Sequence, residues 1–169
     1  MPESVARPES SKGVPQAIWR RQEVREELLA AYPVVVRQAV AWGDMDYYRH
    51  VNNTVYFRYF ENARLEYFRQ LDWFEYERQT GIGPILASTQ ARFRKSLSYP
   101  DSIAVGVRVA DMGEDRFTME YRLVSERAGG VAAEGNGILV TFHYTEARKV
   151  PIPAELRERI ENLERKCKK

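Results

Sequence analysis

The chain has 169 residues, the size of one domain with its own core, and its formal net charge of +2 does not indicate a nucleic acid or a membrane as partner. Cys167 is the only cysteine, so neither an internal disulfide nor a cysteine metal cluster is expected. The sequence starts without an apolar signal segment and has no run of about 18 apolar residues, so we expect a cytoplasmic protein.

Residues 1–32 are predicted to form a tail and a short amphipathic helix. The first dozen or so are rich in Pro, Ser and Glu and carry too little apolar surface to offset the entropy of ordering. From Pro15 to Tyr32, apolar residues recur at roughly helical spacing among Arg and Glu. Pro33 ends this helix. The β-branched run from Val34 to Trp42 then predicts a buried strand, which Gly43 terminates.

One long helix is predicted from Thr54 to Trp73, because its apolar residues fall on one helical face, and most of them are aromatic. Asn52 or Asn53 is well placed to cap its N-terminus. An Asn side chain there accepts an otherwise unpaired backbone N–H, which stabilises the helix by about 1 kcal/mol.

Beyond this helix the apolar period changes to two. Four strands are predicted, over residues 84–97, 102–111, 116–126 and 131–144, separated by the turns YPDS, MGED and AGG. After two prolines, the spacing of Leu156, Ile160 and Leu163 predicts a further helix in the C-terminal segment, residues 151–169.

This order of elements defines an α+β domain over residues 33–150, in which a single antiparallel sheet packs on a single helix. It differs from the alternation of strands and helices in a Rossmann fold. The edge strands of such a sheet are commonly paired between subunits, so an oligomer is expected.

Polar residues gather where the first strand gives way to the long helix. Asp44 and Asp46 are followed by His50, Asn52 and Asn53. Backbone N–H groups at a helix N-terminus can hold a carbonyl oxygen that acquires negative charge, and an aspartate beside them can activate water or attack a thioester. An Asp before a helix and an Asn at its cap are also ordinary structural choices.

The string WGDMDYYRHVNNTVYFRYFENARLEYF, residues 42–68, resembles the opening of hotdog-fold acyl-CoA thioesterases of the 4-hydroxybenzoyl-CoA thioesterase-like group. Gly-Asp-x-Asp, His-Val-Asn-Asn and an aromatic helix with Glu-x-Ala-Arg recur there. The segment ARFRKSLSYPDSIAV, residues 91–105, is similar to the strand, turn and strand that follow. The resemblance covers about residues 34–146. It implies an antiparallel sheet wrapped around one long central helix, an acyl-CoA substrate, and a homodimer or homotetramer.

By the same resemblance, Asp46 is the catalytic carboxylate, and the backbone N–H near Asn53 polarises the thioester carbonyl. Asp44 is expected to be structural. His50 could orient Asp46 or the water, although a lone loop histidine is more often a packing or hydrogen-bonding residue.

Some members of that group use a Glu of the long helix as the base, and Glu61 and Glu66 are the alternatives here. Both could instead pair with neighbouring arginines at local helical spacing, which is the more common role of such residues.

The substrate pocket is expected to involve Tyr47, Arg49 and Tyr56. Arg49 stands where many relatives have glycine, a residue that permits φ > 0 and close approach of the substrate, so the shape of the pocket mouth is in question. Tyr47 and Tyr48 are expected to narrow that mouth further, and Tyr56 is one of the aromatic residues that suit an aryl or a fatty acyl group alike.

Arg92, Arg94 and Lys95 form a basic cluster that could meet the phosphates of coenzyme A. Alternation along a strand splits the cluster, with Arg92 and Arg94 on one face and Lys95 on the other. No Gly-rich phosphate loop, histidine pair or cysteine cluster indicates a metal or a nucleotide fold, so no metal is expected, and no cofactor beyond the coenzyme A of the substrate.

The leading hypothesis is therefore an acyl-CoA thioesterase that releases a free acid and CoA. An enoyl-thioester hydratase or dehydratase is an alternative, since His50 lies four positions after Asp46. A non-catalytic acyl-thioester binding module is another, because a fold does not by itself fix a function.

Overall fold

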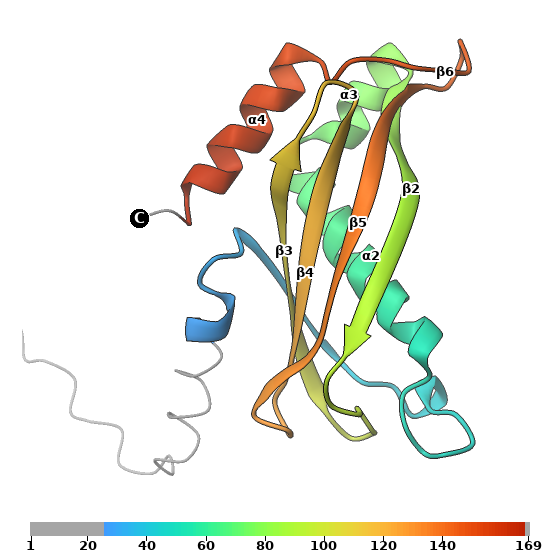
Figure 1. Ribbon diagram of the computed structural model, residues 1–169, viewed down its shortest axis with the longest axis vertical. Coiled ribbons are helices and arrows are strands. Elements are labelled where there is room, and N and C mark those ends of the chain that lie inside the picture. Colours follow the sequence, from blue (N-terminus) through green and yellow to red (C-terminus); the bar gives the residue numbers. More distant parts are fainter. Residues whose placement is uncertain (1–25, 168–169) are drawn as a thin grey trace, which may run out of the picture.

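In the computed structural model, which describes residues 26–167, an antiparallel sheet curls around one long helix (Figure 1). The strands are β1 (Val34–Ala39), β2 (Ile82–Phe93), β3 (Ser102–Met112), β4 (Arg116–Ser125), β5 (Gly130–His143) and β6 (Arg148–Lys149). The helices are the 3-10 turn η1 (Trp42–Asp44), α2 (Asn53–Gln70), α3 (Trp73–Thr80) and α4 (Ala154–Arg165). The strands lie in the order β1-β3-β4-β5-β2, and β6 pairs with the end of β5.

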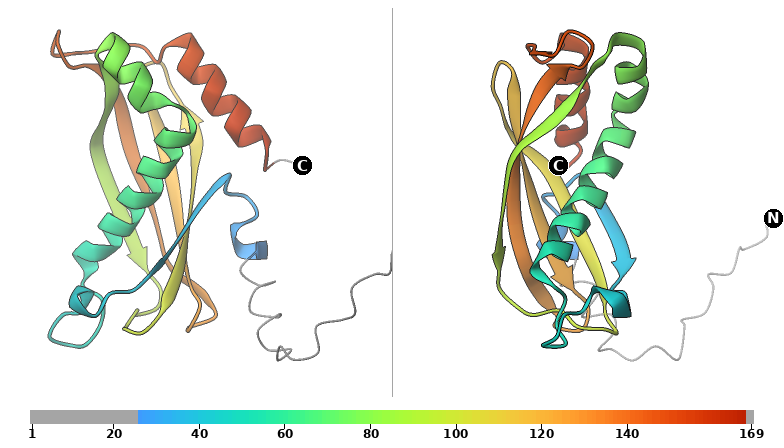
Figure 2. Two further views of the ribbon diagram at one scale, coloured as in Figure 1. Left: turned by 180° about the vertical axis from the view of Figure 1, so that it is seen from behind. Right: turned by 90° about the vertical axis from the view of Figure 1, so that its right-hand side faces the viewer.

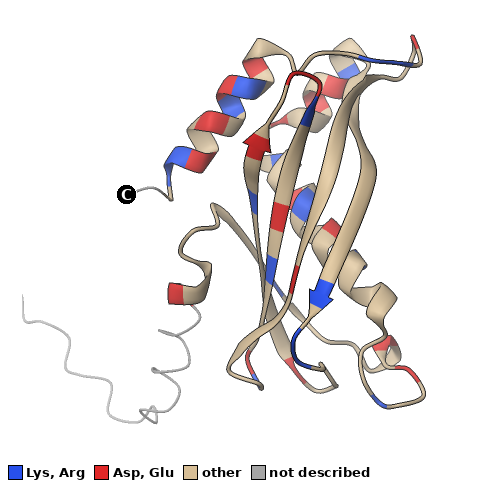
Figure 3. Cartoon of the chain, viewed as in Figure 1, with Lys and Arg blue, Asp and Glu red and all other residues tan. Residues whose placement is uncertain are grey.

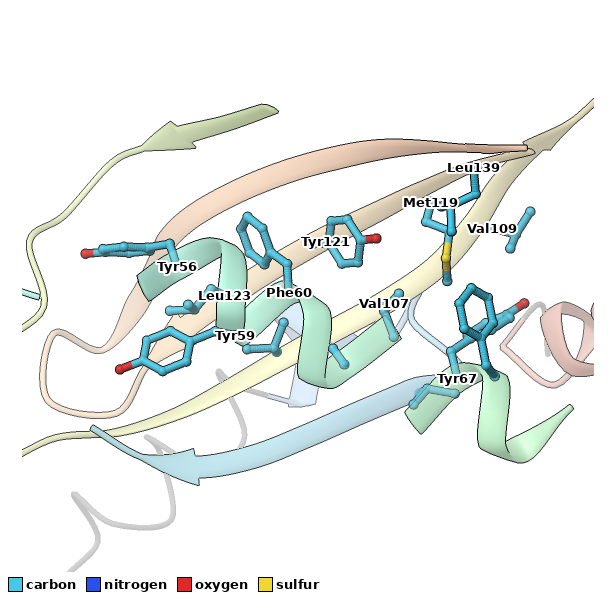
Figure 4. Packing of buried hydrophobic residues seen from close by; sticks show 14 of the residues in the cluster. Tyr56, Tyr59, Phe60, Tyr67, Val107, Val109, Met119, Tyr121, Leu123 and Leu139 are labelled. Carbon is cyan, nitrogen blue, oxygen red and sulfur yellow. The ribbon is translucent and has the colours of Figure 1, made fainter. Parts of the chain in front are cut away.

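The core lies between α2 and the inner face of the sheet (Figure 4). The alternation predicted for β3 and β4 is confirmed, because Ile103, Val105, Val107 and Val109 and their counterparts Phe117, Met119, Tyr121 and Leu123 are all buried. The helix contributes mainly aromatic rings. Phe60 stacks on Tyr121 with ring centroids 4.9 Å apart and planes inclined by 12°.

The single long helix expected from Thr54 to Trp73 is wrong at its C-terminal end. The helix α2 ends at Gln70, Asp72 takes a left-handed conformation with φ 51°, and α3 starts at Trp73. The turn buries Trp73 completely, against Phe68 and Phe117. An apolar period cannot reveal such a break, because the residues on both sides of it still face the core.

The core around the central helix also takes in the C-terminal helix. The predicted C-terminal helix is present as α4, and its residues Leu156, Ile160 and Leu163 are buried in the same core as α2. The amphipathic spacing correctly located that helix, but it could not tell which surface the helix covers.

The observed strand ends differ from the predicted ones by a few residues. The first strand ends at Ala39, because Trp42–Asp44 form η1. The second strand runs over Ile82–Phe93 and contains Pro84, which an edge strand tolerates since it needs no hydrogen bond on its open side. The two-residue strand β6 had no recognisable pattern in the sequence.

On the outer face of the sheet, the segment before β1 forms a second small core. Leu29 and Tyr32 pack against Ala104 and Val124, whose side chains point away from α2. Of the helix predicted over residues 15–32, residues 26–29 are helical and residues 30–32 are not, while residues 15–25, with the predicted tail, lie outside the described residues. Figure 2 shows this segment and α2 on different sides of the sheet.

A substitution at Gly135 tests how tightly α2 is packed on the sheet. A methyl group there would lie 2.6 Å from Phe60 Cε2 and 2.7 Å from the backbone oxygen of Gln90. We expect Gly135→Ala to lower the free energy of unfolding by about 1–3 kcal/mol, measured by denaturant unfolding. Gly113→Ala, whose new methyl would have its nearest neighbour at 3.5 Å, is the control and should change stability little. Equal stabilities of the two variants would contradict this packing.

Candidate active site

The polar loop between η1 and α2 is closed at its neck by backbone hydrogen bonds. The N–H of Asn52 donates to the Asp44 carbonyl at 2.9 Å, and the N–H of Asp46 donates to the His50 carbonyl at 2.8 Å. Between these two bonds, Met45 and Val51 form an isolated antiparallel bridge. The loop is therefore a small hairpin, in which Asp46 and His50 face each other just above the neck.

The tip of this hairpin consists of Tyr47, Tyr48 and Arg49, all exposed. Arg49 has φ 60° and donates its N–H to the Asp46 carbonyl at 3.0 Å. This is the left-handed conformation that glycine adopts freely and that costs other residues roughly 1–2 kcal/mol. The turn thus keeps the backbone conformation that a glycine would take. Arg49 differs from that glycine only by its side chain, which adds an exposed guanidinium.

A pocket of about 340 Å³ lies beside the hairpin. It is lined by Asp46, His50, Val51, Asn53, Tyr56, Phe93, Arg94, Lys95 and Ser96. The hairpin, α2, β2 and the connection after β2 meet there, and all but β2 contribute polar side chains. The predicted residues Tyr47, Arg49 and Arg92 do not line this pocket.

The start of α2 leaves one backbone donor free at the pocket. Asn52 is the N-cap, and its side-chain oxygen accepts the N–H of Thr54 at 2.9 Å, while its carbonyl accepts the N–H of Val55 at 2.9 Å. Within residues 26–167 the N–H of Asn53 makes no hydrogen bond, as expected of the first residue of a helix. This donor can therefore meet a ligand oxygen, with the positive end of the helix dipole behind it.

The Asp46 carboxylate has one oxygen engaged and one available. Its Oδ1 accepts the N–H of Tyr48 at 2.8 Å, which fixes the side chain in the turn. In the described part of the chain, no hydrogen bond reaches Oδ2, and none joins the carboxylate to the ring of His50. Asp46 and Asn53 thus line one pocket, Asp46 with a carboxylate that can accept a proton and Asn53 with a backbone N–H that can donate a hydrogen bond.

Tyr56 and Phe93 form the aromatic wall of the pocket. Their rings meet edge to face with centroids 4.9 Å apart, and the Tyr56 hydroxyl accepts the N–H of Leu97 at 3.2 Å. Burial raises the pKa of Tyr56, so its hydroxyl stays neutral. Phe93 was missed by the sequence reasoning, although its place between Arg92 and Arg94 puts it on the strand face opposite to theirs.

The basic cluster is divided between two hollows. Lys95 lines the candidate site and donates to the Ala128 carbonyl at 3.3 Å, whereas Arg92 lines a separate hollow of about 520 Å³ on the outer face of the sheet. Arg94 borders both hollows, and its Nε donates to Glu134 at 2.6 Å. The outer hollow belongs to a face on which Lys, Arg, Asp and Glu residues lie across several strands (Figure 3).

The helix glutamates form local ion pairs and do not line the pocket. Glu61 lies 3.6 Å from Arg64, and Glu66 lies 2.7 Å from Arg69. Hydrogen bonds from Arg69 and then Gln70 lower the pKa of Glu66 to about 2, which makes it a weak proton acceptor. Among residues 26–167, no three His, Cys, Asp or Glu side chains are grouped as metal ligands would be, and no helix is long and apolar enough to cross a membrane.

Comparison with solved structures defines the class of fold. A thioesterase from Thermus thermophilus, solved with coenzyme A and Zn, is 34% identical with a TM-score of 0.70, and the match covers 79% of this chain and 96% of that chain. The curled antiparallel sheet with its central helix is the hotdog fold of these thioesterases, which confirms the expected α+β fold.

The sequence also matches a family model and two named relatives. The model described as the thioesterase-like superfamily matches residues 40–160, and the chain belongs to this family. The long-chain acyl-CoA thioesterase FadM of Escherichia coli is 21% identical over 119 residues, which cover 70% of this chain and 90% of FadM. Protein THEM6 of Danio rerio is 29% identical over 99 residues, 59% of this chain, which span only about half of that protein (49%). These matches support thioester hydrolysis as the general class of reaction.

Proposed function

We propose that the protein is an acyl-CoA thioesterase and that Asp46 and the N–H of Asn53 carry its chemistry. The observation on which this rests is that one pocket is lined both by Asp46, whose carboxylate has a free oxygen, and by Asn53, whose N–H at the start of a long helix makes no hydrogen bond within residues 26–167. The thioester carbonyl oxygen would accept from the Asn53 N–H, where the helix dipole stabilises the negative charge that develops on it.

Asp46 would then act in one of two ways. As a general base it takes a proton from water, the water oxygen bonds to the carbonyl carbon, and the C–S bond breaks to release the thiolate of CoA. As a nucleophile it attacks the carbonyl carbon itself, the C–S bond breaks to release the thiolate of CoA, and water then hydrolyses the resulting anhydride to the free acid and the original Asp46 carboxylate. Both routes end in a free acid and CoA, and neither requires a metal or a further cofactor. His50, at the same pocket, would bind or orient the water.

The substrate would enter with its acyl group against the aromatic wall of Tyr56 and Phe93. Lys95 and Arg94, which also line the pocket, would meet the phosphates of coenzyme A. The exposed Tyr47 and Arg49 would border the mouth of the pocket. Arg92 would contact coenzyme A only if the nucleotide of the coenzyme reached the outer face of the sheet.

Asp46→Asn is expected to lower kcat by about 10²- to 10⁴-fold, because the amide neither accepts a proton from water nor attacks a thioester. Release of CoA is measured with a thiol reagent on a panel of aryl, short-chain and long-chain acyl-CoAs. The exposed Asp111→Asn serves as the matched control.

Retained hydrolysis by Asp46→Asn would rule out this mechanism. Water addition to an enoyl-CoA, followed by loss of its conjugated absorbance, would identify the hydratase instead. Tight CoA binding without turnover of any substrate would identify the binding module.

Lys95→Ala is expected to raise KM for the best acyl-CoA about fivefold with little change in kcat, since an exposed charge contact contributes roughly 1 kcal/mol. The corresponding acyl-pantetheine, which has no nucleotide phosphates, should show no such change. Lys149→Ala, at an exposed position on β6, is the control. If KM rose equally for the acyl-CoA and the acyl-pantetheine, Lys95 would not contact the nucleotide phosphates.

We further propose that two copies pair through β2, as a homodimer or within a homotetramer. This edge strand pairs only with β5 among the described strands, and Leu86 and Phe93 on it are 39% and 47% exposed. An open edge with exposed apolar side chains favours pairing with another strand. Light scattering at micromolar concentration should give at least twice the mass of one chain, and Leu86→Lys should lower it, whereas Phe74→Lys on α3 should not. A wild-type mass of one chain would contradict the pairing.

A further inference from the structure

The carboxylate of Asp44 joins α2 to the segment that follows β1. Its Oδ2 accepts the hydroxyl of Tyr59, on α2, at 2.8 Å, and the N–H of Ala41, just after β1, at 3.3 Å. Its Oδ1 lies 3.8 Å from Nη1 of Arg58. Asp44 does not line the pocket, so its side chain faces the helix and not the substrate.

The backbone of the same residue closes the hairpin that carries Asp46. The Asp44 carbonyl accepts the N–H of Asn52, the residue that caps α2. Asp44 is therefore tied to α2 twice, through its backbone at the N-cap and through its side chain at Tyr59, almost two turns further along the helix. These ties set both the height and the tilt of the hairpin relative to the helix start.

Tyr59 is well suited to this role. Its side chain is buried, with 4% of its surface exposed, and the Asp44 side chain is 15% exposed, so water competes little for the bond between them. Burial and then the hydrogen bond to Asp44 raise the pKa of the Tyr59 hydroxyl, which keeps it a donor throughout the neutral range.

We propose that the hydrogen bond between Tyr59 and Asp44 is a positioning device that holds the Asp46 carboxylate at its working distance from the N–H of Asn53. This inference rests on the proposed thioesterase function and assigns Tyr59 and Asp44 a part in it as positioning residues. The two aspartates of the Gly-Asp-x-Asp motif thus do different work: Asp46 meets the substrate, and Asp44 holds Asp46 in place.

The test compares two buried tyrosines on the same helix. Tyr59→Phe removes the hydroxyl that reaches Asp44, and Tyr67→Phe removes one that reaches Glu164, also at 2.7–2.8 Å, at the far end of α2. Because misplacement of a reacting group by about 1 Å can cost about 10²-fold in rate, we expect Tyr59→Phe to lower kcat by about 10- to 100-fold with KM changed less than about twofold. Tyr67→Phe should leave kcat unchanged even if it lowers the melting temperature.

Substitutions of Asp44 separate positioning from direct chemistry. Asp44→Asn keeps an oxygen that can accept from Tyr59 and Ala41, so it should retain most of the kcat that Asp44→Ala loses. A variant Asp44→Asn as inactive as Asp46→Asn would overturn the proposal, because Asp44 would then act as a carboxylate in the reaction. Equal loss of kcat in Tyr59→Phe and Tyr67→Phe would overturn it as well.

A second measurement distinguishes failure of this inference from failure of the proposed function. Amide hydrogen exchange of Asp46 and Asn52 should be faster in Tyr59→Phe than in the wild type or Tyr67→Phe, whether or not any thioester is hydrolysed. A wild-type protein that hydrolyses nothing refutes the thioesterase, whereas unchanged exchange at these two amides refutes the positioning device.

Discussion

The aromatic face of α2 packs against the inner face of the sheet, and the candidate site takes its position from this contact. Large aromatic side chains bury much apolar surface each and interlock with few alternative arrangements, so they hold the helix in one register on the strands. The first turn of α2 projects to the end of the sheet, where the hairpin and the end of β2 also lie. The N–H that we propose to bind the thioester oxygen is thus carried by a rigid element.

The hairpin gains its rigidity from polar contacts, because it has little apolar surface to bury. Its neck is closed by backbone bonds, its turn by the Asp46 side chain, and its attachment to α2 by Asn52 and Asp44. The two kinds of order are complementary: apolar packing places the helix, and hydrogen bonds place the loop relative to it. A site that needs a carboxylate and an N–H at a fixed separation requires both the apolar packing and the hydrogen bonds.

Much of this could be predicted from the sequence. Apolar periods located the strands and α2, and the resemblance of residues 42–68 pointed to the fold and to Asp46, His50 and Asn53, which the structure brings to one pocket. The break at Asp72 could not be predicted, because it depends on one backbone conformation that leaves the apolar pattern intact. The link between Tyr59 and Asp44 was equally hidden, since Tyr59 fits the apolar face of the helix and its hydroxyl partner is set by tertiary structure.

The small core on the outer face of the sheet has a consequence for where the folding unit begins. The family model matches from residue 40, and the first strand starts at Val34, yet Leu29 and Tyr32 lie before both and cover Ala104 and Val124. The ring of Tyr32 rests on Gly106, and the guanidinium groups of Arg108 and Arg122 lie 5.4 and 5.5 Å from its centroid. A shortened chain that began at Pro33 would keep the whole candidate site but uncover an apolar strip on the sheet, with the risk of self-association that such a strip brings. The N-terminal boundary of the stable unit is therefore set by Leu29 and Tyr32 and lies upstream of the residues that the family model matches.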